Sequence, residues 1–134
     1  FTCAWQLAPA MAAGNGVVLK PSELTPFSSV VIAMLLESDG LPKGLINIVN
    51  GLGKSTGAAL TDHPAISKLV FVGSPQSGRM IAEAGARRLV PSVLELGGKS
   101  ANIVFADAKL DEAVAGAQAA IFAAAGQSCV APPI

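Results

Sequence analysis

A cysteine in a loop of small residues is the first candidate for chemistry. Cys129 follows Gly126-Gln127-Ser128, directly after a predicted helix, where a substrate could reach its sulfur. The thiolate is the nucleophilic form, and a helix N-terminus or a positive neighbour favours it. Free cysteines are also commonly buried and inert, and position alone favours that structural interpretation of Cys129.

Glu95 is the second candidate, because it stands near the end of the apolar segment 93–96 and just before Gly97-Gly98-Lys99. If that segment is a parallel strand, the carboxylate lies at the edge of the sheet where ligands bind in open α/β folds. Apolar surroundings would favour proton uptake, as a general base requires. A salt bridge or a helix-cap contact is an equally good interpretation of the residue by itself.

Lys20 and Glu23 follow another short apolar segment, 16–20, and are therefore expected at the same edge. An ammonium group and a carboxylate can both bind ribose hydroxyls, and the carboxylate disfavours a 2′-phosphate, which favours NAD over NADP. Without other evidence, a solvated loop pair is the better interpretation of these two residues.

Two glycine-containing segments compete as phosphate sites. Segment 51–57 resembles a dinucleotide fingerprint, but its last gap is one residue too long, and Ile48 excludes a phosphate loop of the NTPase type. In the second, Gly73 ends a predicted strand and Ser74-Pro75 begins a helix whose free backbone amides could bind an anion. Gly73 and Ser74 are thus the preferred site, although ordinary helix capping explains them equally well.

Composition excludes several classes of function. Nine basic and nine acidic residues cancel, which gives no indication of a nucleic-acid partner and leaves a small molecule as the expected one. One histidine and two distant cysteines support no metal site. No apolar run approaches the roughly 20 residues of a membrane span, and no signal peptide is recognisable, so we expect a cytoplasmic protein.

Helical and strand-like segments alternate along the chain, which predicts an α/β fold of the Rossmann-like type: an open, mostly parallel sheet with helices on both faces. Because the sequence opens inside an apolar helical pattern, we expect this sheet to be incomplete and the chain to be a fragment. Helices are expected at 2–13, 25–39, 55–60, 74–88 and 110–124, and strands at 16–20, 45–49, 68–72, 93–96 and 102–105.

Five ordered motifs resemble the aldehyde dehydrogenase superfamily over nearly the whole chain. The 34 positions from Glu95 to Cys129 also resemble that family's interval between base and nucleophile. The resemblance implies that residues 1–134 are mainly the dinucleotide-binding domain and end at the start of the catalytic domain. The motifs are Ala8-Pro9-Ala10 with Ala13-Gly14-Asn15, Val18–Glu23 with Thr25-Pro26, Phe71–Ser74, Leu94–Ser100 and Gly126–Cys129.

The resemblance implies NAD(P)-dependent oxidation of a small-molecule aldehyde to a carboxylic acid. Cys129 would form a thiohemiacetal that loses hydride to the cofactor and becomes a thioester, and Glu95 would activate the water that hydrolyses it. Lys20 and Glu23 would bind the adenine ribose. Gly73 and Ser74 would meet the pyrophosphate, and the backbone of Leu96 the nicotinamide amide.

Two alternatives remain open: a CoA-acylating relative and a non-catalytic homologue. Glu95 favours water over CoA, because CoA-using relatives often lack that base. The chain departs from the family pattern at Val72, at Ala101 and at Pro132-Pro133-Ile134. Half of the family's oxyanion hole and most of the catalytic domain also lie outside the sequence. We therefore expect the isolated chain to be inactive and the parent protein to be an active homo-oligomer.

Overall fold

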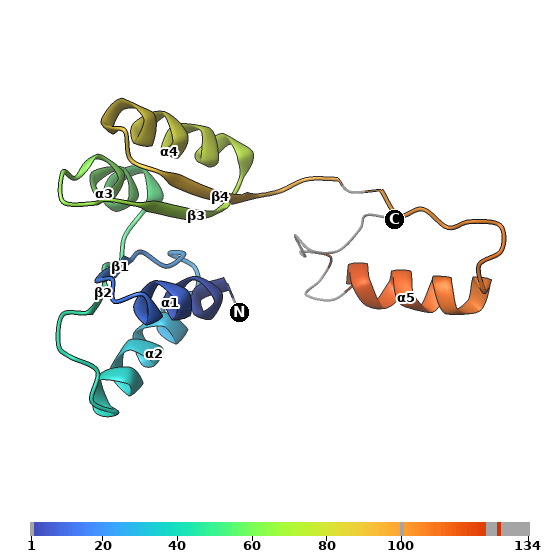
Figure 1. The fold of residues 1–134 in the computed structure, drawn as a ribbon, viewed down its shortest axis with the longest axis horizontal. Helices are drawn as coiled ribbons and strands as arrows, with labels where there is room; N and C mark the ends of the chain where they lie inside the picture. Colours follow the sequence, from blue (N-terminus) through green and yellow to red (C-terminus); the bar gives the residue numbers. More distant parts are fainter. Residues whose placement is uncertain (1, 100, 123–125, 127–134) are drawn as a thin grey trace. The chain divides into compact units, whose positions relative to one another are not determined.

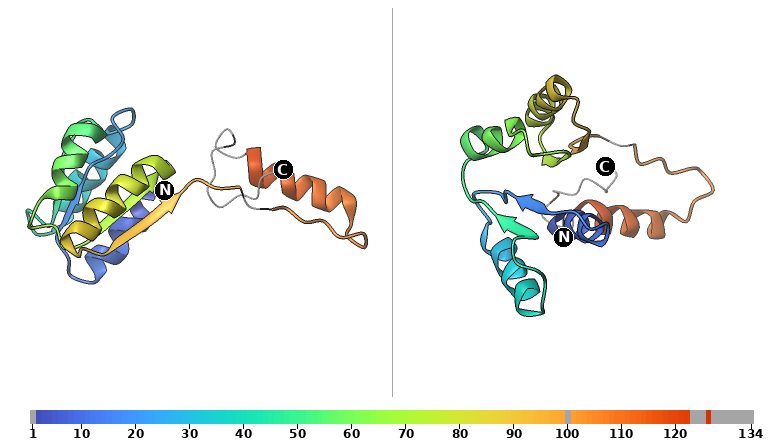
Figure 2. Two further views of the ribbon diagram at one scale, coloured as in Figure 1. Left: turned by 90° about the horizontal axis from the view of Figure 1, so that it is seen from above. Right: turned by 60° about the vertical axis from the view of Figure 1, so that its left-hand side comes forward.

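A computed structural model describes residues 2–99, 101–122 and 126 of the chain. The chain divides into two compact units, which we describe separately. The first unit holds the described residues up to Val70 together with Met80–Val93, and the second holds Phe71–Arg79 and the described residues from Leu94 onward. Figures 1 and 2 show the elements in both units.

The first unit opens with two helix–strand pairs. They are α1 (Thr2–Ala12) with β1 (Val17–Leu19), and α2 (Phe27–Ser38) with β2 (Ile46–Ile48). The strands pair in parallel, with Val17 opposite Ile46 and Leu19 opposite Ile48. α1 contacts β1 and α2 contacts β2 (Figure 1). The predicted parallel pairing is thus confirmed at these two strands, and their carboxyl ends share one edge.

Glycine ends α1 where the sequence predicted. Gly14 has a φ of +76°, its amide donates to the Met11 carbonyl, and the next amide, that of Asn15, donates to the Ala10 carbonyl. This is the Schellman arrangement, whose left-handed residue is usually glycine. α4 (Pro75–Arg88) ends in the same way with Leu89, a rare non-glycine residue at a φ of +56°.

After β2 the chain enters a π-helical turn, η1 (Gly53–Gly57), and the short helix α3 (Ala58–Asp62). Two strands, β3 (Leu69–Gly73) and β4 (Ser92–Leu96), form a second two-stranded sheet. Side chains from four elements are buried to below a tenth of their full exposure and form the small core. They are Leu7, Ile46, Leu69 and Ala84.

One predicted strand is wrong. Residues 102–105 lie before α5 (Leu110–Phe122) and pair with none of the described strands, and Ile103 and Phe105 are 71% and 73% exposed. A strand requires hydrogen bonds from a neighbouring strand, and none of the described residues supplies them. The remaining helices and strands lie where predicted, usually within two residues, so the α/β fold class is confirmed.

Candidate active site and cofactor-binding edge

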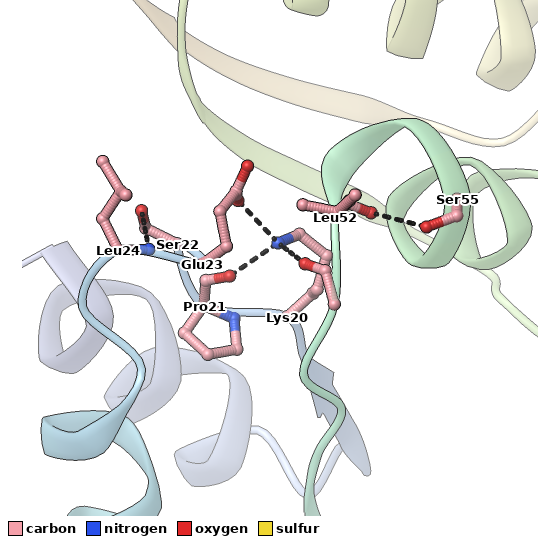
Figure 3. Close-up of polar contacts among 8 residues, drawn as sticks. Lys20, Pro21, Ser22, Glu23, Leu24, Leu52 and Ser55 are labelled. Atoms are coloured by element: carbon pink, nitrogen blue, oxygen red, sulfur yellow. Dashed lines mark hydrogen bonds and ion pairs between the residues drawn. The ribbon is translucent and has the colours of Figure 1, made fainter.

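Lys20 follows β1 directly and reaches across the carboxyl edge of the first sheet. Its Nζ donates to the backbone carbonyl of Pro21 at 2.6 Å and to that of Gly51, beyond β2, at 2.9 Å (Figure 3). The side chain is 17% exposed. Its alkyl part lies beside Gly57 of η1, where an added Cβ would be 3.7 Å from Cδ of Lys20. Lys20 therefore connects the residues that follow both strands.

Glu23 lies beside this ammonium group, with its Oε2 3.5 Å from Nζ of Lys20 and its side chain 47% exposed (Figure 3). Hydrogen bonding with its own backbone amide is the main cause that holds the pKa of Glu23 below its usual range; desolvation opposes it, and the charge and hydrogen bonding of Lys20 lower the pKa further. The carboxylate is thus ionised at neutral pH and faces solvent, as a ribose-binding group requires. Lys20 and Glu23 thus lie together beyond the carboxyl end of β1. Their predicted position at the same sheet edge as Glu95 stays a prediction, because Glu95 belongs to a strand of the second sheet.

Gly51 can only be glycine in this conformation. Its φ is +146°, a value that L-residues rarely adopt, and an added Cβ would overlap the Thr56 hydroxyl. The close approach of residue 51 to η1 places its carbonyl where Lys20 can bind it. Asn-Gly pairs are typical of turns, but the local sequence gives no sign that Lys20 binds here, because the contact joins residues 31 positions apart.

Ser74 caps α4 as the sequence predicted. Its Oγ accepts a hydrogen bond from the Ser77 amide at 3.1 Å, and it also contacts the Ser77 hydroxyl. Gly73 ends β3, and an added Cβ there would be 2.5 Å from the ring of Phe71. Both Gly73 and Ser74 are exposed. Pro75 has no amide hydrogen, and the Ser77 and Gly78 amides are bonded to Ser74, so within the described residues only the Gln76 amide of this turn has no partner.

Glu95 and Leu96 form the carboxyl end of β4, and their side chains differ in exposure. Leu96 is half-buried and lies against Gly78 of α4, where an added Cβ would be 2.6 Å from a Leu96 methyl carbon. Glu95 is exposed. The strand alternates between covered and exposed positions, so Glu95 lies on the face opposite Leu96. The described residues do not provide the apolar surroundings that the sequence predicted for Glu95.

Cys129 lies outside the described residues, so its role as the nucleophile opposite Glu95 stays a prediction. Lys20 and Glu23 belong to the first compact unit, whereas Gly73, Ser74, Glu95 and Leu96 belong to the second. Lys20 and Glu23 are in direct contact, whereas Gly73 and Glu95 lie on the neighbouring strands β3 and β4.

The described residues contain a hollow away from the candidate site, and they contain neither a metal-ligand cluster nor a membrane-spanning helix. A shallow, mostly apolar hollow of about 370 Å³ lies between α5 and residues 102–108, and none of the predicted site residues lines it. Across residues 2–99, 101–122 and 126, no three histidine, cysteine or acidic side chains gather as metal ligands. Within the same ranges no helix is long and apolar enough to cross a membrane.

Comparison with known proteins decides the family. A model of the aldehyde dehydrogenase family matches residues 1–133. The chain belongs to the aldehyde dehydrogenase family. It is 49% identical over 127 residues to a probable betaine aldehyde dehydrogenase of Schizosaccharomyces pombe, a match that covers 95% of this chain and 25% of the relative.

Two solved structures have the same fold over nearly the whole chain. The chain superposes on the NAD complex of PnpE with a TM-score of 0.91 at 49% identity, covering 96% of this chain and 26% of that one. For the NAD⁺ complex of a Bacillus cereus aldehyde dehydrogenase, the TM-score is 0.93 at 42% identity, with 97% and 26% covered. The chain thus spans about a quarter of the length of the relatives it matches.

Proposed function

We propose that the protein containing this chain oxidises an aldehyde to a carboxylic acid, with NAD, or less favourably NADP, as the hydride acceptor. The observation that carries the proposal is the family match over residues 1–133, a range that includes both Glu95 and Cys129. Two of the solved relatives are NAD complexes, which supports the choice of cofactor.

The residues at the edge of the first sheet fit such a cofactor. An ammonium group has three donors, and Lys20 makes two short hydrogen bonds to carbonyls, which leave the 3.5 Å contact with Glu23 as its weakest. A ribose hydroxyl could accept from Lys20 and donate to Glu23. At the exposed start of α4, the Gln76 amide and the Ser74 hydroxyl could donate to a pyrophosphate oxygen.

In the proposed reaction, the Cys129 thiolate attacks the aldehyde carbonyl carbon, and the backbone amide of Cys129 donates to the oxygen that becomes negative. The adduct becomes a thioester by losing its hydride, which a bound nicotinamide would accept, and the Leu96 backbone would hold the nicotinamide amide. The Glu95 carboxylate then takes a proton from the water that attacks the thioester, which releases the acid and the free thiol. The exposure of Glu95 leaves it accessible to water.

The proposal extends to the organisation of the parent protein. Residues 1–134 would supply mainly the dinucleotide-binding domain and would end where the catalytic domain begins. The remaining three quarters of a protein of the relatives' length would then provide most of the substrate pocket. We place this parent protein in the cytoplasm as a homo-oligomer.

Product analysis with the full-length protein tests the reaction. Incubation with an aldehyde and NAD should give equimolar NADH and carboxylic acid, and added CoA should change neither rate nor product. Turnover that depends on CoA and yields an acyl-CoA would replace the proposal with the acylating alternative.

Iodoacetamide separates an enzyme from a non-catalytic homologue. A catalytic Cys129 should be labelled at neutral pH much faster than Cys3, which is half-buried near Ser29. Peptide mapping of the full-length protein, with and without NAD, gives both rates. An inert Cys129 in the folded protein would support the non-catalytic alternative.

A further inference from the structure

The chain contains two Asn-Gly pairs, each next to a strand of the first sheet. Asn15-Gly16 precedes β1 and Asn50-Gly51 follows β2, and both asparagines are exposed. Glycine after asparagine leaves the following amide nitrogen without a neighbouring Cβ, so it can approach the asparagine side chain closely. Such pairs are therefore the asparagine sites at which intramolecular attack on the side-chain amide is least hindered.

The two asparagine side chains differ in their hydrogen bonds. Nδ2 of Asn15 donates to the Ala10 carbonyl at 3.0 Å, which holds the amide against the end of α1. Within the part of the chain that the structure describes, the Asn50 side chain has no hydrogen-bond partner, and neither has the Gly51 amide. Only Asn50 is therefore free to turn its amide carbon toward the next backbone nitrogen.

We propose that Asn50-Gly51 is a site of spontaneous deamidation. Hydroxide removes the Gly51 amide proton, and the nitrogen attacks the side-chain carbonyl carbon of Asn50. A new C–N bond forms, and the side-chain nitrogen takes a proton from water and leaves as ammonia. Water then opens the resulting five-membered imide at either carbonyl, which gives aspartate or isoaspartate without any change of oxidation state.

The modification would alter the Lys20 contacts described above. The Gly51 carbonyl, one residue from the reacting side chain, accepts the 2.9 Å hydrogen bond from Lys20. Isoaspartate adds one carbon to the main chain before Gly51, which must displace this carbonyl. Either product also places a new carboxylate next to the residue that binds Lys20. This inference does not depend on the proposed aldehyde oxidation.

A time course of peptide mapping tests the proposal, with Asn15 as the internal control. The folded full-length protein is kept in mildly alkaline buffer, and a parallel sample is kept unfolded in urea. Fragment ions locate the amide-to-acid mass gain at each asparagine. In the folded protein, Asn50 should react at least about fivefold faster than Asn15, the factor that one ordinary hydrogen bond is worth.

In urea the two sites should react at similar rates, because the bond from Asn15 to Ala10 is then lost. An Asn50→Gln variant should abolish the signal at position 50, since the corresponding six-membered imide forms much more slowly. Equal rates at Asn15 and Asn50 in the folded protein, or a faster rate at Asn15, would overturn the proposal.

Discussion

Lys20 donates a hydrogen bond to Gly51, and the backbone conformation of residue 51 requires glycine. The Gly51 carbonyl accepts from Lys20, and its positive φ together with the nearby Thr56 hydroxyl excludes a side chain at residue 51. The local sequence predicted Lys20 and Glu23 as a pair, because both follow an apolar strand. It could not predict the Lys20–Gly51 hydrogen bond, because that contact depends on the register of β1 with β2.

Gly51→Ala should lower the free energy of unfolding by more than about 1 kcal/mol, because it combines a strained φ with a steric overlap. Gly53→Ala is the matched control. No atom lies within 4 Å of an added Cβ at Gly53, and its φ is not positive. That change should be neutral or stabilising by up to about 1 kcal/mol. Urea denaturation of both variants measures the difference, and equal losses would contradict the account.

The pKa of Glu23 gives a second test at this scale. Folding lowers this pKa, so the ionised Glu23 carboxylate stabilises the fold. That stabilisation is present above the pKa of the unfolded state and is lost as pH falls through the pKa of the folded state. Lys20→Met should raise the Glu23 pKa, but only in part, since hydrogen bonding with its own amide remains. A carboxyl NMR titration measures the shift. Lys43→Met, a change in an exposed loop lysine, should leave it unchanged; an equal shift there would contradict the assignment.

The elements themselves were largely predictable where their signals are local. Ser74-Pro75 predicts the start of α4, and Gly14 predicts the end of α1, because capping depends on residues within one turn. The predicted strand at 102–105 failed because strand pairing depends on a distant neighbour that the described residues do not include. Arg88 was also missed, although it connects α4 to α3 and to the loop before β3.

Arg88→Leu should destabilise the fold by about 1.5–3 kcal/mol, the usual value of hydrogen bonds from a charged donor. Its guanidinium donates to the Thr61 carbonyl at 2.6 Å and to the Ile66 carbonyl at 2.8 Å. Arg87→Leu is the neighbouring control, since among the residues that the structure describes Arg87 makes a single polar contact, an exposed 3.5 Å ion pair with Asp62. Loss of this ion pair should lower the free energy of unfolding by less than about 1 kcal/mol. Similar losses for the two variants in thermal denaturation would show that Arg88 has no special role.

At the scale of the whole molecule, the 134 residues span about a quarter of the length of the relatives that they match. Five ordered motifs were enough to indicate the family, because their joint spacing is far more specific than any single glycine or cysteine. The spatial arrangement of Glu95 and Cys129 could not be predicted from these motifs, since it depends on how distant segments pack.

The isolated chain should produce no NADH from an aldehyde and NAD. It spans a quarter of the relatives' length and lacks most of the proposed catalytic domain, so an aldehyde bound to it would not be oriented for reaction. Absorbance of NADH measures this, with the full-length protein as the positive control. Measurable turnover by the isolated chain would show that residues 1–134 suffice.

The central claim is that Cys129 is the nucleophile and Glu95 the base of an aldehyde dehydrogenase. Rapid mixing of the full-length protein with aldehyde and NAD tests it by following the first turnover of NADH. Glu95→Gln should keep the initial burst and lose about 10²- to 10⁴-fold in steady-state rate, whereas Cys129→Ser should lose the burst itself. A burst that survives in Cys129→Ser, or disappears in Glu95→Gln, would contradict the claim.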